Sequence, residues 1–200
     1  MKTYTIKRIT GAPDWDTVPT LTLEEHLWLE SDHIKTYAQI CYDDEALYVR
    51  MQAVEPHIRA EYTAPLSMVC RDSCMEFFFA PVPEDDRYIN FEINPNCCTC
   101  IGIGSGRADS VRLVPSNEED LFQKQAERTA DGWLVSYRIP VSFLRALFPG
   151  YRPESGTVIR ANCYKCGDSA EKAHYLAWNP IDHPTPDFHR LCDFGAMILE

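Results

Sequence analysis

Long apolar runs are missing from this 200-residue sequence. No stretch approaches the roughly 18 apolar residues that a membrane-spanning helix requires. Internal repeats and low-complexity tracts are missing as well. The first residues, Met1–Arg8, alternate polar and apolar side chains and show no signal-peptide pattern. We therefore expect a cytoplasmic protein with mostly reduced thiols.

Positive charge is scarce. The chain has 19 Lys and Arg residues against 30 Asp and Glu residues, a formal net charge of −11. This excess would repel both a nucleic-acid backbone and an anionic membrane surface. We therefore expect neither nucleic acid nor membrane as a partner, whereas a neutral partner such as a glycan stays compatible with the charge.

Apolar and aromatic residues are plentiful enough for a sizeable core, at 45% and 12% of the chain. Proline and glycine punctuate short segments, as is typical of β-sandwiches. A chain of this length commonly folds as one unit in that class. The sequence therefore predicts a single β-sandwich domain over residues 1–200.

Short segments with alternating or β-rich composition predict most of the strands. They are Tyr4–Ile9, Lys35–Asp43, Ala46–Val54, Ser73–Ala80, Tyr88–Asn94, Cys100–Gly104, Phe122–Thr129, Trp133–Ile139, Val158–Lys165, His174–Trp178 and Phe194–Leu199. The turn Ala130-Asp131-Gly132 predicts a hairpin between two of them.

Only Glu24–Leu29 and Val141–Phe148 have a helical pattern, and Pro140 suits the start of the second. The predicted fold class is all-β: a two-sheet antiparallel β-sandwich, jelly-roll-like, with one or two short helices.

One face of the predicted sheet is polar. Successive side chains of a strand point to opposite faces, so Ile89, Phe91 and Ile93 point to the core while polar residues between them point out. The outward groups of several strands are Glu76, Asn90, Glu92, Asn94, Arg138, Arg160, Asn162 and Tyr164. Amide, carboxylate and guanidinium groups are suitable partners for vicinal sugar hydroxyls. The alternative is that this polar face only contacts solvent and binds no ligand.

Trp178 lies in Leu176-Ala177-Trp178-Asn179-Pro180, where a strand gives way to a loop. An aromatic ring at such a position can serve as a platform for the apolar face of a pyranose. The alternative is that Trp178 is a core residue.

Several segments, taken together, resemble the family 9 carbohydrate-binding modules, and the resemblance covers nearly the whole chain. The matching stretches are Asp72–Phe78, Tyr88–Asn94, Gly132–Pro140, Arg160–Asn162, Tyr175–Pro180, Pro186–His189 and Phe194-Gly195. The resemblance implies a β-sandwich jelly roll that binds a mono- or oligosaccharide without catalysis. In this family two tryptophans clamp a terminal sugar, and polar side chains hold its hydroxyls.

The resemblance assigns one clamp tryptophan to Trp178 and a ligand-binding glutamate to Glu76. The second clamp tryptophan is expected just before Asp72, where this chain has Met68-Val69-Cys70-Arg71 and no aromatic residue. Glu92 stands where the family has an arginine. The chain therefore looks like a divergent stand-alone branch of the family. The predicted ligand-binding residues are Trp178, the outward groups Glu76, Asn90, Glu92, Asn94, Arg160, Asn162 and Tyr164, and in addition Arg71 and His189.

The family's structural calcium gives a further possibility, although no cofactor is otherwise expected. The acidic loops Asp14-Trp15-Asp16 and Glu84-Asp85-Asp86 offer oxygen ligands for it.

Nine cysteines open the alternative of a zinc site. The candidates are Cys97, Cys98 and Cys100 in one run and the pair Cys163 and Cys166 in another. On a regular strand Cys163 and Cys166 would point to opposite faces. Buried free cysteines are common in cores, so free thiols are the preferred interpretation.

Two other functions compete with sugar binding. Glu76 and Glu92 on neighbouring strands could form the carboxylate pair of a glycoside hydrolase, which requires a separation of roughly 5–10 Å across a cleft. Arg71, Asp72, His174 and His189 could add acid–base groups. The third alternative is a protein-interaction domain of the same fold with no sugar ligand.

Overall fold

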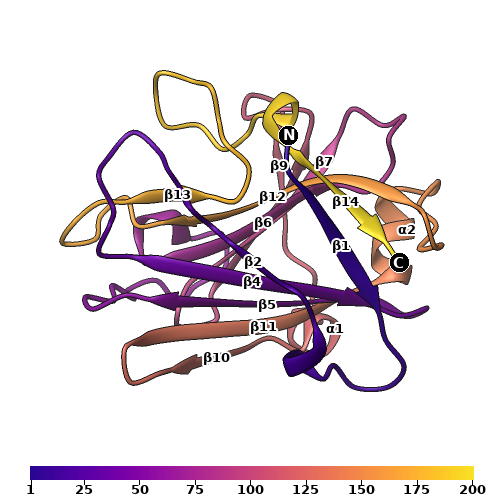
Figure 1. The fold of residues 1–200 in the computed structure, drawn as a ribbon, viewed down its shortest axis with the longest axis horizontal. Coiled ribbons are helices and arrows are strands. Elements are labelled where there is room, and N and C mark those ends of the chain that lie inside the picture. The colour runs from indigo at the N-terminus through magenta and orange to yellow at the C-terminus, as the bar shows by residue number, and fades with distance from the viewer.

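The computed structural model describes residues 1–200 as an all-β fold, with two short α-helices at its periphery (Figure 1). The strands are β1 (Thr3–Arg8), β2 (Thr20–Thr22), β3 (Glu25–His26), β4 (Lys35–Tyr42), β5 (Ala46–Val54), β6 (Cys74–Ala80), β7 (Tyr88–Ile93), β8 (Thr99–Gly104), β9 (Val111–Leu113), β10 (Gln125–Arg128), β11 (Gly132–Pro140), β12 (Val158–Cys166), β13 (Tyr175–Ala177) and β14 (Gly195–Leu199). Every predicted strand is confirmed at least in part. The strands without a sequence prediction, β2, β3 and β9, have three residues or fewer.

The helices are α1 (Glu118–Phe122) and α2 (Val141–Leu147), together with single 3-10 turns η1 (Trp15–Thr17), η2 (Val69–Arg71) and η3 (Leu191–Asp193). Helix α2 confirms the prediction for Val141–Phe148. The predicted helix at Glu24–Leu29 is wrong, because β3 pairs there with β13 in antiparallel register. None of these helices is long and apolar enough to cross a membrane.

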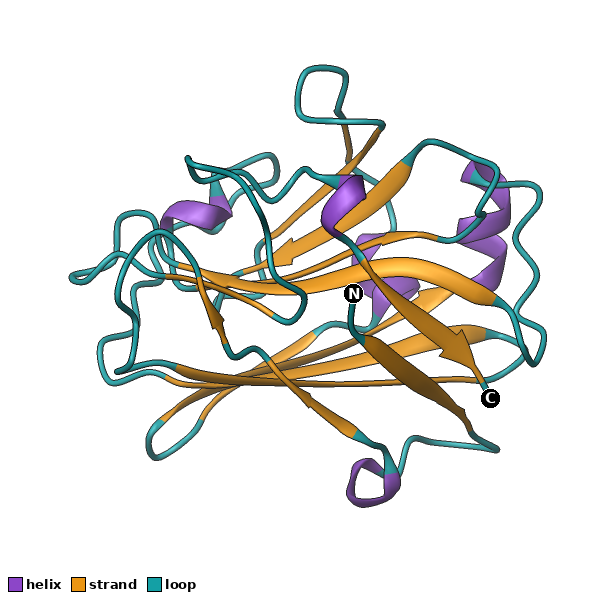
Figure 2. Cartoon of the chain, turned by 45° about the horizontal axis from the view of Figure 1, so that its top comes forward, coloured by secondary structure: helices purple, strands orange, loops and turns teal.

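The strands follow one continuous path in the order β10-β11-β5-β4-β1-β14-β12-β6-β7-β8-β9. The path curls so that its two halves face each other as layers (Figure 2). Strand β1 joins the halves, since it pairs in parallel with β14 on one side and with β4 on the other. The prediction of two separate antiparallel sheets is therefore not confirmed: the structure has a curled mixed sheet.

The main core lies between the two layers and contains 35 buried residues. Alternation along the strands supplies it from both sides, with Met75, Phe77 and Phe79 from β6 and Val49 and Met51 from β5. This is the core face that the period-two pattern of β6 and β7 predicts.

The opposite face of β6, β7 and β12 is also covered, by loops from elsewhere in the chain. A second hydrophobic cluster of 14 buried residues lies there, with Phe78 and Tyr164 from the strands and Leu27 and Phe188 from the covering loops. All seven residues of β6 are consequently buried. The sheet face that the sequence predicts to be polar and open is thus covered by loops. These loops also form the walls of a cavity.

Candidate functional site

A cavity of about 160 Å³ opens between the outer face of β6 and β7 and the loops that cover it. Its lining combines aromatic rings with charged groups of both signs. The aromatic residues are Trp28, Phe78, Tyr175 and Phe188, the acidic ones Glu76, Glu92, Asp168 and Asp187, and the basic ones Arg107, Arg112 and His189. A cavity with apolar walls and a few convergent polar groups is the usual form of a small-molecule site.

Three rings from distant parts of the chain form the aromatic wall. Trp28 follows β3, Tyr175 begins β13 and Phe188 lies in the loop before η3. The ring centre of Trp28 is 5.7 Å from that of Phe188 and 5.5 Å from that of Tyr175. Phe188 is itself fixed by parallel stacking on Tyr164, at 4.1 Å between ring centres. The wall is therefore packed in place before any ligand arrives.

Trp28 has a left-handed backbone conformation, with φ of 58°. Such a conformation is uncommon for a bulky residue and is often associated with functional sites. The indole Nε1 donates a hydrogen bond of 2.7 Å to the carbonyl of His183. This bond and the ring contacts hold the indole at the cavity.

Two glutamates form the polar floor. Glu76 on β6 lies directly opposite Glu92 on β7 in the antiparallel ladder, so their side chains point to the same face. Glu76 is buried, with 2% of its surface exposed, and Glu92 is half-buried. Asn90 on β7 donates from Nδ2 to Glu92 Oε1 at 2.9 Å, which orients that carboxylate.

Burial and mutual repulsion disfavour the charged form of this carboxyl pair. Burial, followed by the negative charge of Glu92, raises the pKa of Glu76 well above its usual range. Burial raises the pKa of Glu92 to about 7, against the opposing effect of Arg112 and Arg107. Two facing carboxyl groups cannot both ionise cheaply, so the pair retains a proton near neutral pH.

Two arginines and two aspartates surround the mouth of the cavity. Arg107 donates to Asp187 Oδ1 at 2.9 Å, and the Arg112 guanidinium donates to the carbonyl of Leu66 at 2.9 Å. Burial raises the pKa of Asp168. The carboxyls outnumber the guanidiniums four to two among the lining residues, so the cavity offers no excess of positive charge.

His189 lies on the wall as a neutral imidazole. Its Nδ1 is 2.7 Å from the hydroxyl of Tyr88 on β7. Burial, and then the positive charge of Arg107, lowers the pKa of His189 to about 4. A neutral ring can donate or accept one hydrogen bond toward a ligand.

The structure brings three of the predicted ligand-binding residues to the cavity, namely Glu76, Glu92 and His189. Asn90 supports them from the same face through its bond to Glu92. The two glutamates considered as a catalytic pair are thus side by side and share a cavity.

Two predicted ligand-binding amides instead serve the fold. Asn94 is fully buried, where Nδ2 donates to Asp72 and Oδ1 accepts from the backbone of Cys98. Asn162 is equally buried and exchanges two hydrogen bonds with the backbone of Asn179. The hydrogen bonds of both amides are thus made within the protein, and neither amide lines the cavity.

The other predicted polar residues also lie off the cavity. Arg160 donates to the backbone carbonyls of Cys192 and Phe194. Arg71 is exposed at the end of η2, and Tyr164 lies behind Phe188 as its stacking partner. Tyr164 thus contributes to the site only through the ring it supports.

Trp178 does not present a platform. The ring is 5% exposed and belongs to the main core, where it meets Tyr4 edge-on at 6.5 Å. A Cβ at Gly195 would come within 2.6 Å of Trp178 Cζ3, which shows how closely the backbone covers this ring. The prediction that Trp178 stacks on a sugar is therefore wrong, because both faces of its ring are buried in the protein.

Trp28, Tyr175 and Phe188 were missed as site residues. Tyr175 and Phe188 lie in Tyr175–Pro180 and Pro186–His189, two of the stretches that resemble family 9. Membership of these stretches is the sequence signal that could have identified them. Trp28 fell in the supposed helix, where a tryptophan looks like part of an apolar stripe. Met68 and Cys70 line the cavity where the second clamp ring was expected, and Trp28 supplies an aromatic ring from another segment.

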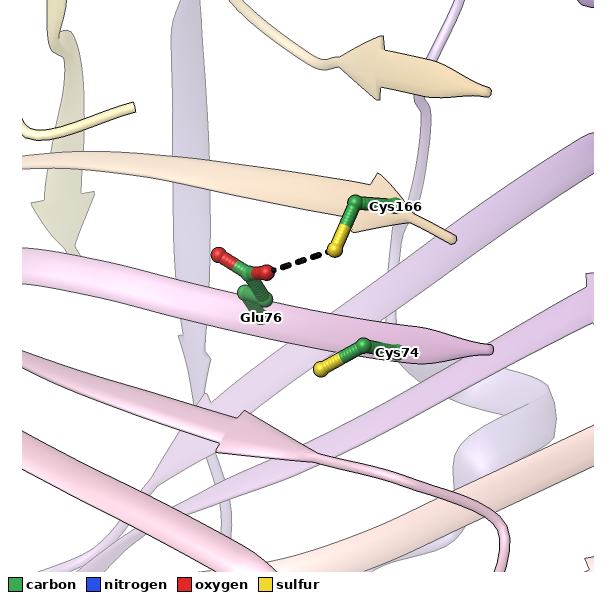
Figure 3. Close-up of side chains that lie close together, drawn as sticks. All are labelled: Cys74, Glu76 and Cys166. Atoms are coloured by element: carbon green, nitrogen blue, oxygen red, sulfur yellow. Dashed lines mark hydrogen bonds between the residues drawn. The ribbon is translucent and has the colours of Figure 1, made fainter. Parts of the chain in front are cut away.

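All nine cysteines are free thiols. Cys163 points into the main core and Cys166 into the second cluster, which confirms that their side chains lie on opposite faces. Cys98 donates a hydrogen bond to the carbonyl of Ala64. The thiols that do gather with a carboxyl group are Cys74 and Cys166, next to Glu76 (Figure 3).

Residues 84–86 form one of the two acidic loops considered for calcium. In this loop Asp85 forms an ion pair with Arg87, at 2.6 Å between Asp85 Oδ2 and Arg87 Nη2.

Comparison with solved structures finds this fold in other proteins. An inferred carbohydrate-binding protein from Bacteroides uniformis superposes with a TM-score of 0.85 at 23% identity, covering 100% of this chain and 99% of its own. A family 9 carbohydrate-binding module from Caldicellulosiruptor kristjanssonii superposes with a TM-score of 0.69 at 14% identity, covering 100% of this chain in its cellotriose and glucose complexes and 94% and 96% of its own. These likenesses show the fold.

No curated protein sequence matches the chain. The sequence model of carbohydrate-binding family 9, however, matches residues 11–199. This match spans nearly the whole chain and includes every element that lines the cavity. The chain therefore belongs to carbohydrate-binding family 9.

Proposed function

We propose that the protein binds a neutral mono- or oligosaccharide without catalysis, in the cavity walled by Trp28, Tyr175 and Phe188. The observation that carries the proposal is this aromatic wall facing a floor of carboxyl groups. A pyranose has one C–H-rich face and a rim of hydroxyls, so it can contact both at once. Family membership supports the sugar class, and the C. kristjanssonii module was solved with cellotriose and with glucose.

The size of the cavity favours one sugar ring. Its volume of about 160 Å³ is well below the roughly 300–1,000 Å³ of cavities that enclose drug-sized ligands. A longer oligosaccharide would place its terminal ring inside and extend past the mouth between Arg107 and Arg112. These guanidiniums have donors to spare for sugar hydroxyls.

The charges favour a neutral ligand. Anionic ligands such as phosphates are usually held by an excess of arginine or lysine, whereas here Glu92, Asp168 and Asp187 accompany the two arginines. The carboxyl pair can serve a polyol in two ways, since a protonated carboxyl donates and an ionised one accepts. We place the recognition of vicinal hydroxyls at Glu92 and His189, with Trp28 as the stacking ring in place of Trp178.

Calorimetric titration with glucose and cellotriose tests the proposal. Trp28→Ala is expected to weaken binding about tenfold, because ring contacts of this kind contribute up to roughly 1.5 kcal/mol. The matched control is Trp15→Ala, since Trp15 is also partly exposed but lies on η1, away from the cavity. Equal affinity of the Trp28→Ala and wild-type proteins would refute the stacking role. Absence of binding by the wild type at millimolar sugar would favour the protein-interaction alternative.

A further inference from the structure

Two thiols lie next to Glu76, whose carboxyl group forms part of the floor of the cavity. Cys74 and Glu76 are two residues apart on β6, so both point to the outer face, and Cys166 on β12 lies directly opposite Cys74. One ligand atom from each of these side chains lies within 4.8 Å of the other two. In Figure 3 the Glu76 carboxyl from β6 and the Cys166 thiol from β12 point toward each other, and the Cys74 thiol lies close by on β6. Each side chain is at most 2% exposed.

The cluster has no cation of its own. The Glu76 carboxyl accepts one hydrogen bond, from the Cys166 thiol at 2.9 Å. Lys165 is next in sequence to Cys166 but lies on the opposite face of β12, where its Nζ is 3.2 Å from Glu55. Burial raises the pKa of Glu76 and Cys166 well above the usual range and that of Cys74 to about 12. Without a cation these groups keep their protons, because a buried charge without a partner is costly.

We propose that Cys74, Cys166 and Glu76 bind a transition-metal dication of the zinc type. Thiolate and carboxylate are both established zinc ligands, and tetrahedral coordination by three side chains leaves one position for an outside ligand. Calcium and magnesium prefer sites made of oxygen atoms only, so the thiols select against them. Binding displaces the two thiol protons and the carboxyl proton. The charge of the dication offsets two of the three negative charges that result, so the loaded cluster carries a net charge of −1.

Glu76 links this site to the cavity, although the two thiols do not line it. Glu76 is both a member of the cluster and part of the cavity lining, and Cys70 lines the cavity beside it. A water molecule or a hydroxyl group of a cavity ligand can therefore be the fourth ligand. The metal site does not depend on the proposed sugar binding, because an ion alone would satisfy the cluster.

Metal uptake by the 200-residue chain tests the inference without any sugar. The protein is reduced, stripped with a chelator, incubated with Zn²⁺ or Co²⁺ alone and then dialysed. We expect one metal ion per chain by elemental analysis. With Co²⁺ we expect thiolate-to-metal charge transfer in the near ultraviolet and the strong visible bands of tetrahedral cobalt. A protein without stoichiometric metal and without these bands would overturn the proposal.

Variants assign the ligands. Cys74→Ser, Cys166→Ser and Glu76→Gln should each weaken metal binding at least tenfold, which is the order of loss that even supporting residues of metal sites produce. Glu76→Gln is the sharpest variant, since it keeps the shape and the neutral state of the metal-free side chain. Cys163→Ala is the matched control, because Cys163 is equally buried on β12 but points into the main core. Metal binding that survives Glu76→Gln or is lost in Cys163→Ala would contradict the assignment.

The competing chemistry is a cross-strand disulfide between Cys74 and Cys166. Mass spectrometry of the protein purified without reductant, digested under alkylating conditions, detects such a bond. A disulfide that forms in place of metal binding, with no metal taken up after reduction, would overturn the proposal. Recovery of both cysteines as alkylated, unbridged peptides, together with stoichiometric metal uptake, would support it.

Discussion

Replacing Glu92 with glutamine is expected to stabilise the metal-free protein at neutral and alkaline pH. Burial is the main reason that the pKa of Glu92 stands at about 7 instead of 4.5. A difference of this size corresponds to about 3 kcal/mol at 1.36 kcal/mol per pKa unit. Because Glu92 keeps some contact with solvent, this figure is an upper value.

The direction of the effect follows from proton linkage. A carboxyl whose pKa is raised by folding binds more protons in the folded protein than in the unfolded chain between pH 4.5 and about 7. The free energy of unfolding of the wild type therefore falls across this window as pH rises. Glutamine does not titrate, and its Oε1 can still accept the hydrogen bond from Asn90. The stability difference between variant and wild type should grow from near zero at about pH 4 to about 3 kcal/mol at about pH 8.

Urea denaturation of both proteins over this pH range, with chelator present, measures the difference. Contributions from other titrating groups, such as His189, cancel because both proteins contain them. Glu127→Gln on the exposed strand β10 is the control and should show no such trend. Since Glu76 and Glu92 titrate as a pair, the transition belongs to both groups together. A difference that is constant with pH, or a variant less stable at about pH 8, would refute the reasoning.

Two further predictions concern stability. Trp178→Ala should cost about 3–5 kcal/mol in urea denaturation, because it empties a ring-sized volume of the main core; unchanged stability would contradict that placement. Lys165→Met should cost about 3–5 kcal/mol, because it leaves Glu55 as a buried carboxylate without its cation. Adding Glu55→Gln to Lys165→Met should restore most of this loss, and additive losses in the double variant would exclude the pairing.

Alternation along single strands was predictable from the sequence because it depends only on backbone geometry. Ile89, Phe91 and Ile93 lie in the main core, as their spacing predicts. Glu76 and Glu92 point to the other face for the same reason, and antiparallel pairing sets them opposite each other. This part of the candidate site follows from local pattern combined with strand order.

The loops that cover the outer face of β6, β7 and β12 were not predictable from the sequence. Their position depends on where long irregular segments fold back onto the sheet. Trp28 and Phe188 are 160 positions apart in the numbering, yet their rings meet over β6 and β12. No periodicity marks such a contact. Trp178 illustrates the converse case: its strand-end position fits a platform, but Tyr4 and the backbone at Gly195 enclose the ring.

Pairing partners between distant strands escaped prediction in a similar way. The residues of β1 alternate as expected, but nothing in them specifies parallel pairing with β14 and β4 at once. The segment Glu24–Leu29 has apolar spacing compatible with a helix, and β13 offers its backbone a strand partner instead. Tertiary hydrogen bonds override weak local propensity in such short segments.

The buried carboxyl pair limits what the cavity can hold. Glu76 and Glu92 cannot both be charged without compensation, so one of them needs a proton or a cation. A neutral sugar brings neither, and it can only use the donor and acceptor that the pair already presents. A metal ion on Cys74, Cys166 and Glu76 would replace the proton of Glu76 and leave Glu92 as the carboxyl group that meets a sugar hydroxyl. The two proposed ligands would then occupy adjacent positions in one cavity, and the ion would fix the charge state of the floor on which the sugar rests.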